Sequence, residues 1–194
     1  MKSVNLTAHP DPAVWVLVPN GYPDRRGTDP LGWARSVAED YGPTDAEGRE
    51  RFTLLMQDVA ESERGRDEGD AYLFLPEDLG AMAKARLLFV PTAAVGEDAA
   101  HGPLDPATET FDAQYLGRGT RTVSAGRAHP ANEDLLVTVT YRWDVADLTV
   151  LLVLTTLDPA QAVTMLDELD EFADNLWLED SDGELVGSWD HAEA

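Results

Sequence analysis

The pattern of apolar and polar positions is clearest in the last third of the chain. Two apolar strands are predicted there, Leu135–Trp143 and Leu148–Thr156, joined by a short loop. The second strand has apolar residues at nearly every position, which predicts a central strand buried on both faces of a sheet. Asp158 and Pro159 then predict a helix start, because Asp accepts an N–H from the first turn and Pro needs none to donate there.

The predicted helix runs from this start to Trp177. Its apolar positions recur at helical spacing and should face the sheet. They are Val163, Leu166, Leu169, Phe172, Ala173 and Leu176. The intervening positions carry five carboxylates that we expect on the solvent side, namely Asp167, Glu168, Asp170, Glu171 and Asp174.

The earlier part of the chain alternates between helical and strand patterns. Strands are predicted at Pro12–Pro19, Ala71–Leu75, Ala85–Val95 and Gly117–His129. One helix should begin at Asp29-Pro30, and a second should begin with a capping box of Thr44 and Glu47. A short helix carrying Phe111 and Tyr115 is expected after Asp105-Pro106.

Successive strands joined by short loops indicate antiparallel pairing. We therefore predict an α+β fold with a mainly antiparallel sheet of about six strands and helices on both faces, an α/β/α sandwich. Residues 1–178 should form a single domain, because no linker or repeat divides them, and residues 179–194 should form an acidic tail. Within this tail Asp182-Gly183 is a turn signal, and Trp189 is the residue expected to dock it.

The order of elements resembles the Mog1/PsbP-like fold, including small actinobacterial proteins of this type. The resemblance is carried by the first strand with Trp15, by Tyr141-Arg142-Trp143, by Leu148–Thr156 with the helix start after it, and by Phe172–Trp177. It implies an α/β/α sandwich used for binding, as an adaptor or as a chaperone-like protein, without a shared catalytic centre. No functional residue is carried over from the family.

Charge changes the functional expectations more than any motif. The 194 residues have a formal net charge of −23, and fourteen acidic residues but no Lys or Arg follow Arg142. Such a chain should bind neither nucleic acid nor an anionic membrane, because phosphate binding needs clustered cations. The acidic surface either favours solubility or attracts a basic partner.

The remaining composition narrows the chemistry further. The sequence contains no cysteine, which excludes disulfides, thiolate metal sites and a cysteine nucleophile. It shows neither a secretory signal nor an apolar run long enough to span a membrane, so we expect a cytoplasmic protein.

Searches for catalytic and ligand-binding motifs return little. A phosphate-binding glycine loop, a Gly-x-Ser-x-Gly elbow and a His-Glu-x-x-His motif are all missing. The histidines His9, His101, His129 and His191 lie in predicted loops or near the termini. If Gly183 of the acidic turn is aligned with the invariant glycine of an EF-hand, Leu178 and Trp189 occupy the first and twelfth ligand positions, where carboxylates are required. We therefore predict no enzyme, no cofactor and no metal site.

Two functional hypotheses remain. The first is a non-enzymatic protein-binding, adaptor or chaperone-like protein of the kind that serves a secretion or toxin system. Its partner would be another protein, and the candidate contact residues are Trp143, Asp167, Asp170, Glu171 and Asp174. Trp143 either anchors a partner from the surface or packs against the end of the sheet.

The alternative is a small-molecule binding protein or enzyme that holds an anion. Its pocket would be lined by Arg121, Arg127, Tyr141 and Arg142. These arginines would instead serve structure if they pair with the surplus carboxylates. The sequence leaves the oligomeric state open.

Overall fold

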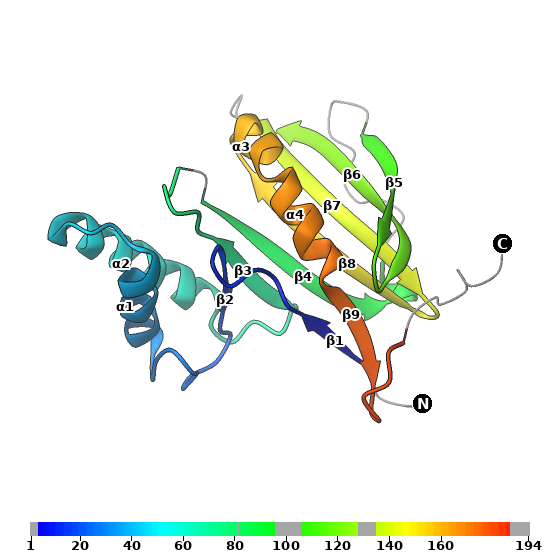
Figure 1. The fold of residues 1–194 in the computed structure, drawn as a ribbon, viewed down its shortest axis with the longest axis horizontal. Helices are drawn as coiled ribbons and strands as arrows, with labels where there is room; N and C mark the ends of the chain where they lie inside the picture. The colour runs from blue at the N-terminus through cyan, green and yellow to red at the C-terminus, as the bar shows by residue number, and fades with distance from the viewer. Residues whose placement is uncertain (1–3, 81, 96–105, 128–134, 187–194) are drawn as a thin grey trace. The chain divides into compact units, whose positions relative to one another are not determined.

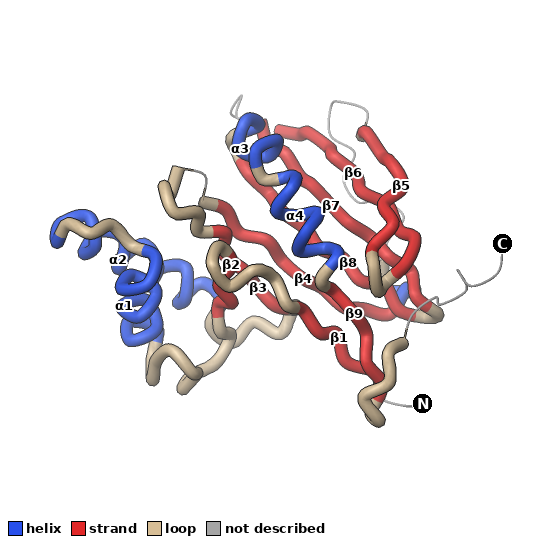
Figure 2. The backbone as a smooth tube through the Cα atoms, viewed as in Figure 1, coloured by secondary structure: helices blue, strands red, loops and turns tan. Residues whose placement is uncertain are grey.

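The computed structural model describes residues 4–80, 82–95, 106–127 and 135–186. It is an α+β protein with a seven-strand antiparallel open sheet, a small two-strand sheet and four helices (Figures 1 and 2). The order of the large sheet is β2-β3-β4-β8-β7-β6-β5, and β1 pairs with β9 in the small one.

The nine strands are β1 (Val4–Ala8), β2 (Trp15–Val18), β3 (Asp70–Phe74), β4 (Ala83–Pro91), β5 (Ala107–Ala113), β6 (Gly117–Arg127), β7 (Leu135–Val145), β8 (Leu148–Thr156) and β9 (Leu176–Asp180). The helices are α1 (Pro30–Tyr41), α2 (Ala46–Glu63), α3 (Pro159–Thr164) and α4 (Leu166–Asp174), with a 3-10 turn at Thr92–Ala94.

Within the described residues, the chain divides into two compact units. One comprises residues 13–84, and the other comprises residues 1–12 and 85–194. The predicted start of an acidic tail at residue 179 falls inside β9, which runs to Asp180 and pairs with β1. After β9 the chain turns at Gly183, where φ is +79°, a conformation that favours glycine.

In the larger unit the β7–β8 hairpin is central. The prediction that Leu148–Thr156 is an interior strand is confirmed, because β8 lies between β4 and β7. Val150, Leu152 and Leu154 on one face are fully buried. Leu151 and Val153 on the opposite face are only half-buried, so the predicted burial on both faces is complete on one face alone.

The register of the hairpin determines which side chains share the buried face. Directly paired residues lie on the same face of a sheet. Leu152 is paired with Tyr141 of β7 and Leu87 of β4, and Arg121 of β6 is in turn paired with Tyr141. The fully buried Leu152 and Tyr141 therefore share their face with a charged guanidinium.

The long helix predicted after Asp158 is interrupted. Asp158 does cap it, accepting from the N–H groups of Ala160 and Gln161, but α3 ends at Thr164 and α4 begins after Met165. The apolar spacing fits α4, whose Leu169, Phe172 and Ala173 are buried. The spacing did not reveal the break, and Trp177 lies on β9 instead of ending the helix.

The segment around Phe111 is also different from the prediction. A short helix was expected there, but Ala107–Ala113 forms β5, the edge strand next to β6. Its sequence alternates Thr, Glu, Thr, Phe and Asp, a period of two that fits a strand better than a helix. Pro106 was overweighted as a helix signal, since Pro is also acceptable at the start of a strand.

The smaller unit packs α1 and α2 around its own apolar core. Trp33 and Val37 of α1, Phe52 and Met56 of α2 and Leu73 of β3 belong to this cluster. The helix start predicted at Asp29-Pro30 is confirmed. The capping box was misplaced by one residue, because Asp45 caps α2 and accepts the N–H of Gly48 at 2.7 Å.

Truncating Phe172 to Ala tests the packing of α4. The side chain is 1% exposed, so we expect a loss of about 3–5 kcal/mol in the free energy of unfolding, measured in urea. Val163→Ala is the control, because Val163 is 70% exposed and should change stability by less than about 0.5 kcal/mol. Equal effects of the two substitutions would contradict the assigned face.

Candidate functional site

The five carboxylates of α4 form what we call the acidic surface: Asp167, Glu168, Asp170, Glu171 and Asp174. Asp167 and Glu171 are exposed, and the other three are half-buried. The expectation that these carboxylates face solvent therefore holds fully for Asp167 and Glu171 and in part for the other three. Three half-buried members lie at the flanks of the helix, where they approach other segments of the chain.

Asp170 is the carboxylate that holds α4 to the sheet. Its two oxygens accept from Nη1 of Arg121 at 2.7 and 2.6 Å, and the hydroxyl of Tyr141 donates to Oδ1 at 2.5 Å. Arg121 also donates from Nε to Glu109 of β5 at 2.8 Å. The guanidinium therefore joins β5, β6 and α4 in one polar network.

Strand register brings these groups together. Glu109 of β5 pairs with Arg121 of β6, and Arg121 pairs with Tyr141 of β7. The three side chains therefore form a row across one face of the sheet. Asp170 lies over this row from α4, and its contact with Arg121 is an example of the alternative in which these arginines pair with the surplus carboxylates.

Burial and hydrogen bonding shift the titration of the network. Burial raises the pKa of Tyr141, and its hydrogen bond to the Asp170 carboxylate raises it further, so the phenol remains a neutral donor. For Arg121, burial alone would lower the pKa, but hydrogen bonds to Asp170 and Glu109 outweigh it, and the pKa is raised. The raised pKa values keep the Tyr141 phenol protonated and the Arg121 guanidinium positively charged, so both can donate to carboxylates.

The negative charges of the other carboxylates in the acidic surface have fewer cations near them than Asp170 has. Among the described residues, no Lys or Arg nitrogen lies within 4.0 Å of a carboxylate oxygen of Asp167 or Glu171. Asp174 accepts the backbone N–H of Gln114 at 3.3 Å. Partial burial, followed by repulsion from Glu171, Asp11 and Asp167, raises the pKa of Glu168.

Trp143 does not lie on the surface. It is 0% exposed and packs beside Tyr141 with ring centroids 6.0 Å apart, and Phe111 meets both rings edge-on. Gly119 makes room for it, because a Cβ there would overlap the indole and the carbonyl oxygen of Arg142. Of the two alternatives for Trp143, packing against the sheet is the one observed. The side chain offers no exposed anchor for a partner.

A different aromatic group follows α4 and is partly exposed. His9 stacks on Trp177 with centroids 4.7 Å apart, and Tyr115 lies 5.6 Å from the same indole. The indole Nε1 donates to Glu179 at 2.7 Å. Because Tyr115 follows Gln114, whose N–H binds Asp174, this group borders the acidic surface. Helical spacing predicted Trp177 at the end of the helix and so did not indicate this aromatic group, because Trp177 lies on β9.

The four residues of the predicted anion pocket are not brought together. Arg121 and Tyr141 share one face of the sheet, as does Arg127 further along β6. Arg142 is on the opposite face and binds Asp144, with Nη2 and Oδ2 3.1 Å apart. Partial burial alone would raise the pKa of Asp144, but hydrogen bonds from Thr149 and Arg142 lower it overall.

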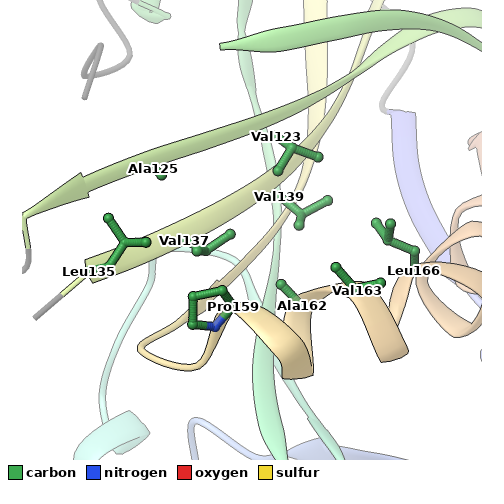
Figure 3. Close-up of a pocket in the computed structure, with 9 residues that line it drawn as sticks. All are labelled: Val123, Ala125, Leu135, Val137, Val139, Pro159, Ala162, Val163 and Leu166. Atoms are coloured by element: carbon green, nitrogen blue, oxygen red, sulfur yellow. The ribbon is translucent and has the colours of Figure 1, made fainter. Parts of the chain in front are cut away.

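An apolar cavity of about 230 Å³ lies between α3 and the sheet (Figure 3). Its sheet side is formed by β6 and β7, and its other side is formed by α3 and the first residue of α4. The lining residues are Val123, Ala125, Leu135, Val137, Val139, Pro159, Ala162, Val163 and Leu166. No motif indicated it, although the alternation that creates its β6 wall is visible in the sequence.

The structure also bears on the metal-ligating residues, the histidines and membrane-spanning segments considered in the sequence. Among the described residues, no three His, Asp or Glu side chains are grouped so that they could hold a metal ion. His101, His129, His191 and Trp189 lie outside the described residues. None of the described helices combines the length and apolarity needed to cross a membrane.

Comparisons with protein-family models, with curated proteins and with solved structures found no match to this chain.

A double-mutant cycle on Arg121→Gln and Asp170→Asn tests the contact between α4 and the sheet. These side chains are 19% and 34% exposed, and we expect a coupling of about 1–2 kcal/mol in the free energy of unfolding. The matched cycle uses Arg118→Gln and Asp112→Asn, which are 70% and 62% exposed, and should give less than about 0.5 kcal/mol. Equal coupling in the two cycles would contradict a fixed contact at Asp170.

Glu168→Gln tests the electrostatic strain in the acidic surface. Because the folded protein raises the pKa of Glu168, the native state binds this proton more tightly than the unfolded chain. The carboxylate therefore costs stability above its folded pKa, and the cost vanishes below the unfolded pKa of about 4.3. We expect the variant to be more stable than the parent at pH 7, with the gain disappearing near pH 4.

Urea unfolding at several pH values measures this gain. Glu184→Gln is the control, because Glu184 is exposed beyond β9 and should give a smaller pH-dependent difference. A loss of stability at pH 7 in Glu168→Gln would contradict the predicted sign.

Proposed function

We propose that this protein is a non-enzymatic protein-binding module, of adaptor or chaperone-like type, whose partner presents a basic surface to α4. The observation that carries the proposal is the uneven compensation of the acidic surface. Asp170 has the guanidinium of Arg121, whereas the exposed Asp167 and Glu171 have no cation within ion-pair distance among the described residues. Their unused charge is available to a partner.

The overall charge supports electrostatic attraction of such a partner. A net charge of −23 produces a negative field that accelerates encounter with a cationic protein and weakens as salt is added. Partial burial is the largest cause of the raised pKa of Glu168, and repulsion from Glu171, Asp11 and Asp167 raises it further. A bound cation from a partner would relieve that repulsion.

The aromatic group at the end of α4 supports the proposal in a second way. Trp and Tyr are frequent anchors in protein interfaces, and Arg side chains stack on their rings. The partly exposed Tyr115 and Trp177 border the acidic surface, so a basic side chain there would meet both a ring and a carboxylate. Trp177 takes the anchoring role first assigned to Trp143.

The wider identity of the protein is part of the same proposal. The resemblance to the Mog1/PsbP-like α/β/α sandwich favours a cytoplasmic binding protein that serves a secretion or toxin system. An anion-binding protein or enzyme that uses Arg121, Arg127, Tyr141 and Arg142 together is less favoured, because Arg142 is on the other face and Arg121 already holds two carboxylates.

Removing two charges from α4 tests the proposal. The variant Asp167→Asn/Glu171→Gln leaves the structural contact of Asp170 intact. We expect it to slow association with a partner captured from the native host by about tenfold at low salt, and to lose most of this effect when salt screens the field over a Debye length of about 8 Å. Surface plasmon resonance at two salt concentrations measures the association rate.

The matched control is Glu39→Gln/Glu50→Gln, which removes the same charge from exposed positions of α1 and α2. It should change the association rate by less than twofold. Equal slowing of association by both variants would show that only the net charge of the protein matters, and would contradict a specific role for α4. Capture of no specific protein partner at either salt concentration would count against the proposal as a whole.

A further inference from the structure

We propose that the cavity between α3 and the sheet is a binding site for a small monocarboxylate with an apolar chain of about eight carbon atoms. An apolar cavity of about 150 Å³ accommodates benzene, with six carbons, so a cavity of about 230 Å³ has room for an octyl-sized chain. This inference is independent of the protein-binding surface on α4.

The cavity follows from small residues in its walls. Ala125 of β6 and Ala162 of α3 leave space where larger side chains would meet. Its helix side is formed by α3 and by Leu166, just beyond the interruption of the helix at Met165. Figure 3 shows the apolar side chains of α3 and of β6 and β7 facing one another across the space.

The space is open to solvent along α3. Val163, which lines it, is 70% exposed, and Leu157 just before α3 is 58% exposed. A partly open apolar hollow with a charged group nearby is typical of small-molecule sites. An apolar chain in the cavity would cover lining groups now in contact with water.

The charged groups around the cavity favour an anionic head group. On the same face of β6, the sequence Arg121, Val123, Ala125, Arg127 places the two cavity-lining residues between two guanidinium groups. Arg121 is bound by Asp170 and Glu109. Arg127 is exposed, and its strand partner Leu135 lines the cavity.

Arg127 is therefore the cation that a carboxylate would meet at this end of the cavity. Among the described residues, no carboxylate lies within 4.0 Å of its guanidinium. At the helix end, the carboxylate of Asp158 already accepts the N–H groups of Ala160 and Gln161. A ligand with an apolar chain and a carboxylate matches both features of the site.

Titration with octanoate and octylamine, which share one chain length and differ in charge, tests the inference. Isothermal titration calorimetry measures affinity, and methyl chemical shifts of Val123, Val139 and Leu166 locate the ligand. We expect octanoate to shift these methyl signals saturably and to bind more tightly than octylamine. No saturable shift with octanoate, or equal affinity for octylamine, would overturn the proposal.

Three variants locate the site. Ala125→Phe fills the cavity and should abolish saturable octanoate binding; Val163→Trp, at an exposed position of the rim, provides the same test if the first variant does not fold. Arg127→Gln should weaken octanoate about two- to fivefold, the range of an exposed ion pair. Arg118→Gln removes the same charge from the opposite face of β6 and should change affinity less than twofold. Octanoate binding unchanged in both filled variants would place the ligand elsewhere and overturn the site.

Discussion

The register of the β7–β8 hairpin is the constraint on which the rest of the larger unit depends. It places Tyr141 and Trp143 opposite Leu152 and Val150, so that these four side chains, all 0% exposed, share one face of the sheet. A shift by one residue would turn Arg142 and Thr140 toward α4 and expose both aromatic rings. The position of α4, the Asp170 contact and the cavity all follow from that single alignment.

The charge on this face of the sheet comes from β6, the strand next to the edge strand β5. Apolar residues of β4, β8 and β7 cover the centre of this face, but β6 contributes Arg121 where α4 passes over it. A half-buried guanidinium is costly unless it is paired and hydrogen-bonded. Asp170, Glu109 and Tyr141 supply those partners, so the network fixes the direction of α4 more than it adds to net stability.

The sequence predicted elements better than it predicted their contacts. Strand β8 and the start of α1 were found because apolar runs and caps are local signals. The strand β5 was taken for a helix because Pro106 was given more weight than the alternation that followed. The pairing of β1 with β9 joins the two ends of the described chain, and no local pattern indicates such a contact.

The same distinction applies to the candidate site. The acidic positions of α4 were visible from helical spacing, but the separate status of Asp170 depends on the register of three strands. Trp143 was considered as a surface anchor because a charged residue flanks it on each side, yet alternation already placed it on the face of Tyr141. The two-residue spacing between Tyr141 and Trp143 was therefore a better guide to the burial of Trp143 than the charge of the residues on either side of it.

The two proposed sites are consistent with one another because they use different parts of the interrupted helix. On α4, Arg121 holds the flank that carries Asp170, and Asp167 and Glu171 are exposed. On α3, small and apolar residues line a space beside Val123 and Ala125. Nearby negative charge would oppose an anionic ligand, but Asp170 and Glu109 are already neutralised in part by Arg121. Arg127, at the other end of the cavity-lining stretch of β6, is then the group whose field a carboxylate would meet first, and the acidic surface is left to a partner of opposite charge.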